Sequence, residues 1–167
     1  MRQGRRWLVA AVVVAGGVGV AWAATGSGHG DPDPGGRVLA ALVRVDQAIP
    51  ADAQVMVRQA HEPQWDSCDG RAGTFGWTGV MVIVQFGTDE PASELISQAD
   101  RILRAEGWQR TGTSTTPLGP TATWSRVVAG STAATASLSP WTRGQGSPIY
   151  WDLDAMAPPH GQRVSGC

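Results

Sequence analysis

Two acidic residues, Asp152 and Asp154, lie two positions apart near the end of the chain. On a β-strand, residues at this spacing point to one face of the sheet, opposite the intervening Leu153. Paired carboxylates can carry out acid–base catalysis or bind calcium. They also occur on the solvent-facing side of an edge strand, which is the commoner arrangement. The pattern makes Asp152 and Asp154 binding candidates without selecting a reaction.

A second polar group occupies the segment from His61 to Asp69. A divalent metal could use the side chains of His61, Glu62, Asp66 and Asp69. Their order matches no established spacing of metal ligands, and Cys68 in the same segment is expected to form a disulfide. We therefore expect a solvated loop, with His61 as a binding candidate and with neither a metal nor a cofactor.

The motifs of common enzyme classes are missing from the sequence. A serine hydrolase of the Gly-x-Ser-x-Gly type needs a strained nucleophile turn, and the chain has no such motif. A phosphate-binding loop of the Gly-x-x-x-x-Gly-Lys type is excluded because the chain contains no lysine. These absences favour a non-enzymatic protein and leave a small hydrolase as the alternative.

Tryptophan is unusually frequent, whereas the chain has only two Phe and one Tyr. Aromatic side chains bind sugars, quaternary amines or partner proteins, but they also fill cores. Trp65 and Trp141 lie in Pro- and Gly-rich segments, so we expect them to be exposed binding candidates. The tryptophans at the starts of elements or in strands are expected in the core: Trp77, Trp108, Trp124 and Trp151.

The chain has two cysteines, Cys68 and Cys167. Two thiols in one small domain outside the cytoplasm most often pair, so we predict a Cys68–Cys167 disulfide. Closing a loop of about 100 residues contributes up to ~4–5 kcal/mol in the chain-entropy model. Two free thiols and a metal site are the alternatives.

The first 24 residues have the features of a signal peptide or a membrane anchor. Three arginines, Arg2, Arg5 and Arg6, precede an uncharged apolar stretch that ends in Ala-Trp-Ala. Cleavage would fall before Ala24. An uncleaved anchor, and export by either the general or the twin-arginine route, remain open. Every version places the rest of the chain outside the cytoplasm.

Residues 25–36 are rich in Gly, Pro and Ser and predict a flexible linker, which leaves 37–167 as one folded domain. Apolar residues at helical spacing predict a helix over 37–48. A second helix should begin after the acidic residues before Pro91 and end at Gly107, in a left-handed cap.

The other elements are expected to be strands. Short strands are predicted at 54–58 and 108–113, and the segment 62–76 between the first strand and the next is expected to be a loop. The nearly continuous apolar run within 77–86 predicts a strand that is buried on both faces. The last strands are predicted at 122–128, 132–138 and 149–153. Together these elements predict an α+β fold, with one mostly antiparallel sheet of about five or six strands and two helices packed on one face.

Several short motifs are spread along the folded part of the chain. They are Cys68-Asp69-Gly70, Gly76-Trp77, Gly107-Trp108, and the stretch from Trp151-Asp152-Leu153 to Pro158-Pro159 before a terminal Gly-Cys. The chain resembles small exported or membrane-tethered actinobacterial proteins that have no assigned activity. The resemblance implies an origin and a compartment, and it carries over no catalytic residue.

The net charge of −1 gives no reason to expect binding to nucleic acid, and membrane contact is expected only through the N-terminal segment. We therefore expect an exported envelope protein, secreted or tethered to the outer face of the cytoplasmic membrane. Its folded domain should bind an envelope protein or a small ligand. The alternative is a small extracytoplasmic hydrolase that uses Asp152, Asp154 or the segment around His61.

Overall fold

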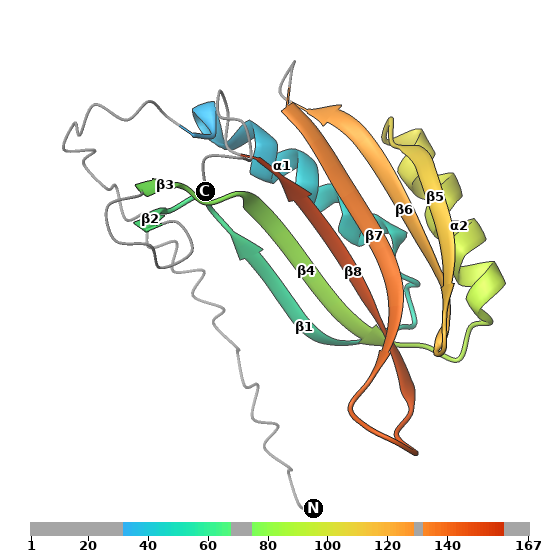
Figure 1. Cartoon of the computed structure of the whole chain (residues 1–167). Coiled ribbons are helices and arrows are strands. Elements are labelled where there is room, and N and C mark those ends of the chain that lie inside the picture. Colours follow the sequence, from blue (N-terminus) through green and yellow to red (C-terminus); the bar gives the residue numbers. More distant parts are fainter. Residues whose placement is uncertain (1–31, 68–74, 129–131, 159–167) are drawn as a thin grey trace, which may run out of the picture. The chain divides into compact units, whose positions relative to one another are not determined.

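The computed structural model describes residues 32–67, 75–128 and 132–158, all within a compact unit that spans 31–167 (Figure 1). The N-terminal part comprises a 3₁₀ turn η1 (Pro34–Gly36), helix α1 (Arg37–Val43), a 3₁₀ turn η2 (Arg44–Ala48), β1 (Gln54–His61), β2 (Trp65–Ser67), β3 (Phe75–Trp77) and β4 (Val80–Gly87). Helix α2 (Ala92–Ala105) follows, and then β5 (Gln109–Thr116), β6 (Gly119–Val128), β7 (Thr132–Thr142) and β8 (Ile149–Ala157).

Six strands form one antiparallel sheet in the order β1-β4-β8-β7-β6-β5, and β2 and β3 form a separate two-stranded hairpin. The predicted α+β class, with one antiparallel sheet and two α-helices, is confirmed. The last strand, β8, lies inside the sheet between β4 and β7. Asp152 and Asp154 therefore lie on an interior strand, whereas the commoner arrangement of such a pair would have placed them at an edge.

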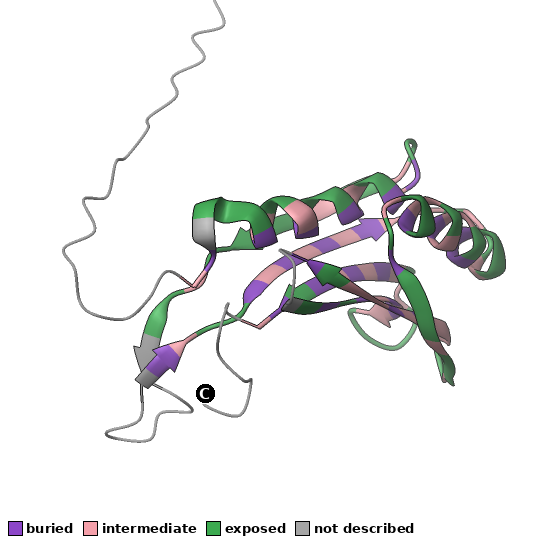
Figure 2. Ribbon diagram, turned by 90° about the horizontal axis from the view of Figure 1, so that it is seen from above, coloured by how far each residue is buried: buried purple, intermediate pink, exposed green. Residues whose placement is uncertain are grey.

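The first predicted helix is present, and its last turn tightens into the 3₁₀ geometry of η2. Val38, Leu42 and Val45 are fully buried, as their helical spacing predicts. They join one core cluster with side chains of α2 and with alternate residues of the sheet. Figure 2 shows α1 and α2 running over the same side of the sheet.

From the sequence we expected the folded domain to begin at Arg37. In the structure it begins earlier. Asp33 is buried, and its carboxylate accepts the backbone N–H groups of Val38 at 2.8 Å and Leu39 at 3.0 Å. These two N–H groups belong to the first turn of α1 and have no partner within the helix. The N-cap position of α1 is Gly36, and the side chain of Asp33 caps the first turn from within the segment that the composition assigns to the linker.

Strand β4 differs from the prediction of a strand buried on both faces. Val80, Val82 and Val84 are buried beneath the helices, but Met81 and Ile83 are only half-buried. The alternation of burial along β4 shows that one face of the sheet forms the core. Because the residues on the other face are also apolar, the sequence of β4 resembles that of a strand buried on both faces, and the prediction was wrong for this reason.

Helix α2 ends as the sequence predicts. Gly107 has a positive φ of 85°, and the N–H of Trp108 donates to the carbonyl of Leu103 at 2.9 Å. A left-handed residue after the last turn favours glycine because it lacks a β-carbon. Trp108 folds back into the core and is 1% exposed.

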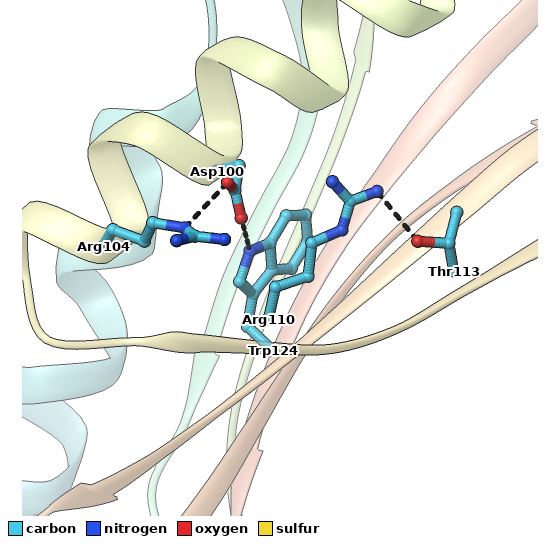
Figure 3. A network of polar contacts seen from close by, with 5 residues as sticks. All are labelled: Asp100, Arg104, Arg110, Thr113 and Trp124. Atoms are coloured by element: carbon cyan, nitrogen blue, oxygen red, sulfur yellow. Dashed lines mark hydrogen bonds and ion pairs between the residues drawn. The ribbon is translucent and has the colours of Figure 1, made fainter.

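A polar contact also fixes α2 to the sheet (Figure 3). The indole N–H of Trp124, on β6, donates to Asp100 of α2 at 2.9 Å, and Arg104 pairs with the same carboxylate at 2.8 Å. Trp124 is fully buried, so its N–H needs an acceptor within the protein. The predicted core positions of Trp108, Trp124 and Trp151 are confirmed.

The segment at 62–76, expected to be a loop, contains the hairpin of β2 and β3. Each of its strands has three residues, which is too short for an alternating pattern to be visible in the sequence. Cys68 and Cys167 lie outside the described residues, as does the N-terminal segment. Within the part of the chain that is described, no helix is long and apolar enough to cross a membrane.

Candidate functional site

The face of the sheet opposite the helices carries the carboxylate pair found in the sequence. Directly opposed residues of an antiparallel sheet share a face, so the register of the strands defines this surface. Ile83, Asp154 and Ser137 form one row across β4, β8 and β7, and Gln85, Asp152 and Ser139 form the next. We call this surface the open face, formed at its centre by Met81, Ile83, Gln85, Thr135, Ser137, Ser139, Asp152, Asp154 and Met156.

The two carboxylates have few partners. The side-chain amide of Gln85 donates to Oδ2 of Asp152 at 3.5 Å, the outer limit of a hydrogen bond. The other oxygen of Asp152, Oδ1, is buried and has no hydrogen-bond partner among the described residues. Asp154 makes no hydrogen bond or ion pair within the described residues. Both side chains are half-buried, so water solvates their negative charges only in part.

These surroundings disfavour the charged forms. Burial, and then the charge of Asp152, raise the pKa of Asp154 from 3.8 to about 6. Burial also raises the pKa of Asp152, an effect that the hydrogen bond from Gln85 opposes. The charged form of each group is therefore held at a free-energy cost. Charged groups that are held against such a cost are common at functional sites.

Two aromatic rings adjoin the carboxylates on the same face. Trp141 on β7 and Tyr150 on β8 are directly opposed, with ring centroids 5.2 Å apart. Tyr150 lies two positions before Asp152 and therefore on its side of the sheet. The guanidinium of Arg143 lies over the Tyr150 ring, 5.6 Å from its centroid. Trp141 is half-buried here, whereas the sequence led us to expect an exposed ring.

The remaining candidates lie apart from the carboxylate pair. His61 is exposed at the end of β1, opposite Met81 and therefore at the margin of the open face, and contacts Gln59 at 3.3 Å. Asp152 is opposite Gln85, four residues farther along β4, so His61 and Asp152 do not form one site. Within the described residues, no three His, Cys, Asp or Glu side chains come together to hold a metal ion.

Trp65 belongs to the β2–β3 hairpin and is 38% exposed. Its ring meets that of Trp77 edge to face, with centroids 5.5 Å apart. Trp77 is half-buried there, so its predicted place in the core is wrong. It lines a cavity of about 360 Å³ where η1, α1, the segment after β1 and β3 meet.

Sequence reasoning missed Gln85, Tyr150 and Trp77. Gln85 could have been found as the polar residue that interrupts the apolar run of β4. Tyr150 shares the spacing rule that pairs Asp152 with Asp154. The position of Trp77 depends on the hairpin, for which the sequence gives no comparable signal. Comparisons with models of protein families, with curated proteins and with solved structures find no match to this chain.

Proposed function

We propose that the chain is an exported envelope protein whose folded domain binds a partner protein on the open face. The occupant is a segment of that partner which carries a cationic side chain. The observation behind this proposal is the pair of half-buried carboxylates, Asp152 and Asp154, which form no ion pair with a described residue.

The negative charge of the two carboxylates favours an occupant with a positive charge. A cation that approaches two carboxylates on one strand gains attraction to both and removes their mutual repulsion. Arginine suits such a site, because its guanidinium donates two parallel hydrogen bonds to a carboxylate and is weakly hydrated. Asp152 has only the long bond from Gln85, and Asp154 has no hydrogen bond within the described residues, so both carboxylates can accept from such a donor.

The surroundings of the carboxylates suit a protein segment. Ser137 and Ser139 offer hydroxyl groups in the same rows, and Met81, Ile83 and Met156 offer apolar contact. A polar centre with flexible methionines and aromatic neighbours is typical of surfaces that bind peptides. Arg143 already covers the ring of Tyr150, so the carboxylates provide the attraction for the incoming cation.

Export is the second part of the proposal, and it depends on the first 24 residues. The natural protein should fractionate outside the cytoplasm, and sequencing of its N-terminus should begin near Ala24 if the segment is cleaved. An intact Met1 in the membrane fraction would indicate an anchor. Recovery of the protein from the soluble cytoplasmic fraction would contradict both.

The binding surface can be tested by site-specific cross-linking in the native cell. A photoreactive residue at Ser137 would lie beside Asp154 on the open face, and one at Ser97, on the exposed side of α2, is a matched control. We expect a discrete adduct from position 137 and none from position 97. The adduct peptide should contain an Arg or a Lys. A neutral or acidic cross-linked peptide would contradict the proposal.

One observation favours a second candidate, a small hydrolase. A carboxyl group with a pKa of about 6 beside a second carboxyl group is an arrangement that can supply a general acid and a base. A substrate screen tests this candidate. Turnover that falls as pH rises through about 6 and disappears in Asp154→Asn would favour the hydrolase over the binding protein.

A further inference from the structure

We propose that the free edge of β5 pairs with the same edge of a second copy of the chain, which joins two sheets into one. The pairing involves the end of the sheet, so it does not depend on the binding function proposed for the open face. β5 is the last strand of the six-stranded sheet and pairs only with β6 among the described strands (Figure 1). An edge strand directs the backbone N–H and C=O groups of alternate residues outward, where a further strand can pair with them.

The residues of β5 leave this edge open to pairing. None of its eight residues is buried, and Thr113, Ser114 and Thr115 are exposed. A bulge lies between Arg110 and Gly112, but the strand beyond it is regular and has no proline and no charge. Natural edges are commonly protected by such features, so their absence from the second half of β5 marks a strand that can accept a partner.

The opposite edge of the sheet has the protection that this part of β5 lacks. Strand β1 carries a bulge between Val55 and Val57. It also carries the exposed residue Arg58, whose guanidinium pairs with Asp46 at 2.9 Å. A sheet with one open edge and one protected edge can form a closed pair of two copies, whereas two open edges would allow a growing fibre.

The side chains of β5 favour its own copy as the second strand. In an antiparallel pair about a two-fold axis near Ser114, the residues that face each other from Thr113 to Thr115 are all threonine or serine. Thr opposite Thr or Ser stabilises paired strands, and threonine is itself favoured in strands. Arg110 is the one charged residue of β5, and its side chain donates to Thr113 of its own strand at 2.9 Å. The axis sets the two Arg110 side chains at opposite ends of the pair, so no like charges face each other.

Disulfide cross-linking of the full chain in its native cell tests the pairing. A cysteine replaces Thr113, Ser114 or Thr115 in turn, because a residue at the two-fold axis lies opposite its own symmetry mate. Gln59→Cys, at an exposed position of the other edge strand, is the matched control, and the wild-type chain gives the background from its own cysteines. After mild oxidation we expect at least one β5 position to give a covalent homodimer, at a yield several-fold above that of the control. Yields equal to the control at all three positions, or an adduct with a different protein instead, would overturn the proposal.

Co-capture of two differently tagged full chains measures the same pairing without a cross-link. Thr113→Lys plus Thr115→Lys sets like charges against each other, so we expect co-capture to fall several-fold. Thr113→Val plus Thr115→Val keeps the branched shape without charge and should retain it. Both positions are exposed, so the urea midpoint of the lysine variant should match that of the wild type. Asp152→Asn plus Asp154→Asn should also retain co-capture, because the open face takes no part in the pairing. Undiminished co-capture in the lysine variant, or its loss in the asparagine variant, would contradict the proposed edge.

Discussion

Replacing Asp154 by Asn should stabilise the folded domain at neutral pH. The carboxylate lies on an interior strand, half-buried and next to Asp152, and its pKa is raised from 3.8 to about 6. In the unfolded chain the group would lose its proton near its ordinary pKa. The folded state therefore holds a proton that the unfolded state has released across this interval, and stability falls as pH rises from about 4 to about 6.

The magnitude follows from the pKa difference. A difference of about two pKa units corresponds to ~3 kcal/mol at ~1.4 kcal/mol per unit. Because the side chain is half exposed and solvent screens its charge, we expect about 1–1.5 kcal/mol. Asn cannot ionise and has nearly the shape of the protonated acid. Asp154→Asn should thus unfold like the wild type near pH 4 and be more stable by ~1–1.5 kcal/mol near pH 7.5.

The assay is urea unfolding followed by tryptophan fluorescence, repeated from about pH 4 to pH 7.5. Trp108 and Trp124 are buried and will report loss of the core. Asp52→Asn is the matched control, because Asp52 is exposed and makes no hydrogen bond or ion pair within the described residues. A destabilised Asp154→Asn near pH 7.5, or a pH profile parallel to that of the wild type, would refute the reasoning.

Three further predictions concern other parts of the chain. Asp33→Ala removes the acceptor of two N–H groups of α1 and should cost about 1–2 kcal/mol in urea unfolding; a loss below a few tenths would contradict the capping role. Gly107→Ala places a β-carbon at a φ of 85° and should cost about 1 kcal/mol, with a lower melting temperature; an unchanged midpoint would count against a strained cap. Protein from its native compartment, unfolded without reductant, should show no titratable thiol, whereas two thiols would exclude the predicted Cys68–Cys167 disulfide.

Local patterns in the sequence predict the helices and long strands well. The spacing of Val38, Leu42 and Val45 and the position of Gly107 each correspond to a repeating or terminal feature of one element. Hydrogen bonding and burial within one element act over a few residues, so a sequence window contains the relevant information.

The neighbours of the carboxylate pair could not be predicted in this way. Gln85 and Asp152 are 67 residues apart, and they meet because β8 inserts between β4 and β7. The order of strands depends on packing of the whole sheet and leaves no trace near either residue. The face on which Asp154 lies follows from its spacing to Asp152 and could be predicted from the sequence. Its raised pKa depends on burial in the folded sheet and could not be predicted.

The most direct test of the proposed binding function compares cross-linking yields in the native cell. The photoreactive residue is kept at position 137, and the wild-type background is compared with the variant Asp152→Asn plus Asp154→Asn. Because both substitutions preserve shape and remove charge, the open face should remain while its attraction for a cation is lost. We predict that the adduct with the basic segment falls to the background seen from position 97. An undiminished adduct in the uncharged variant would contradict the proposal that these carboxylates bind the partner.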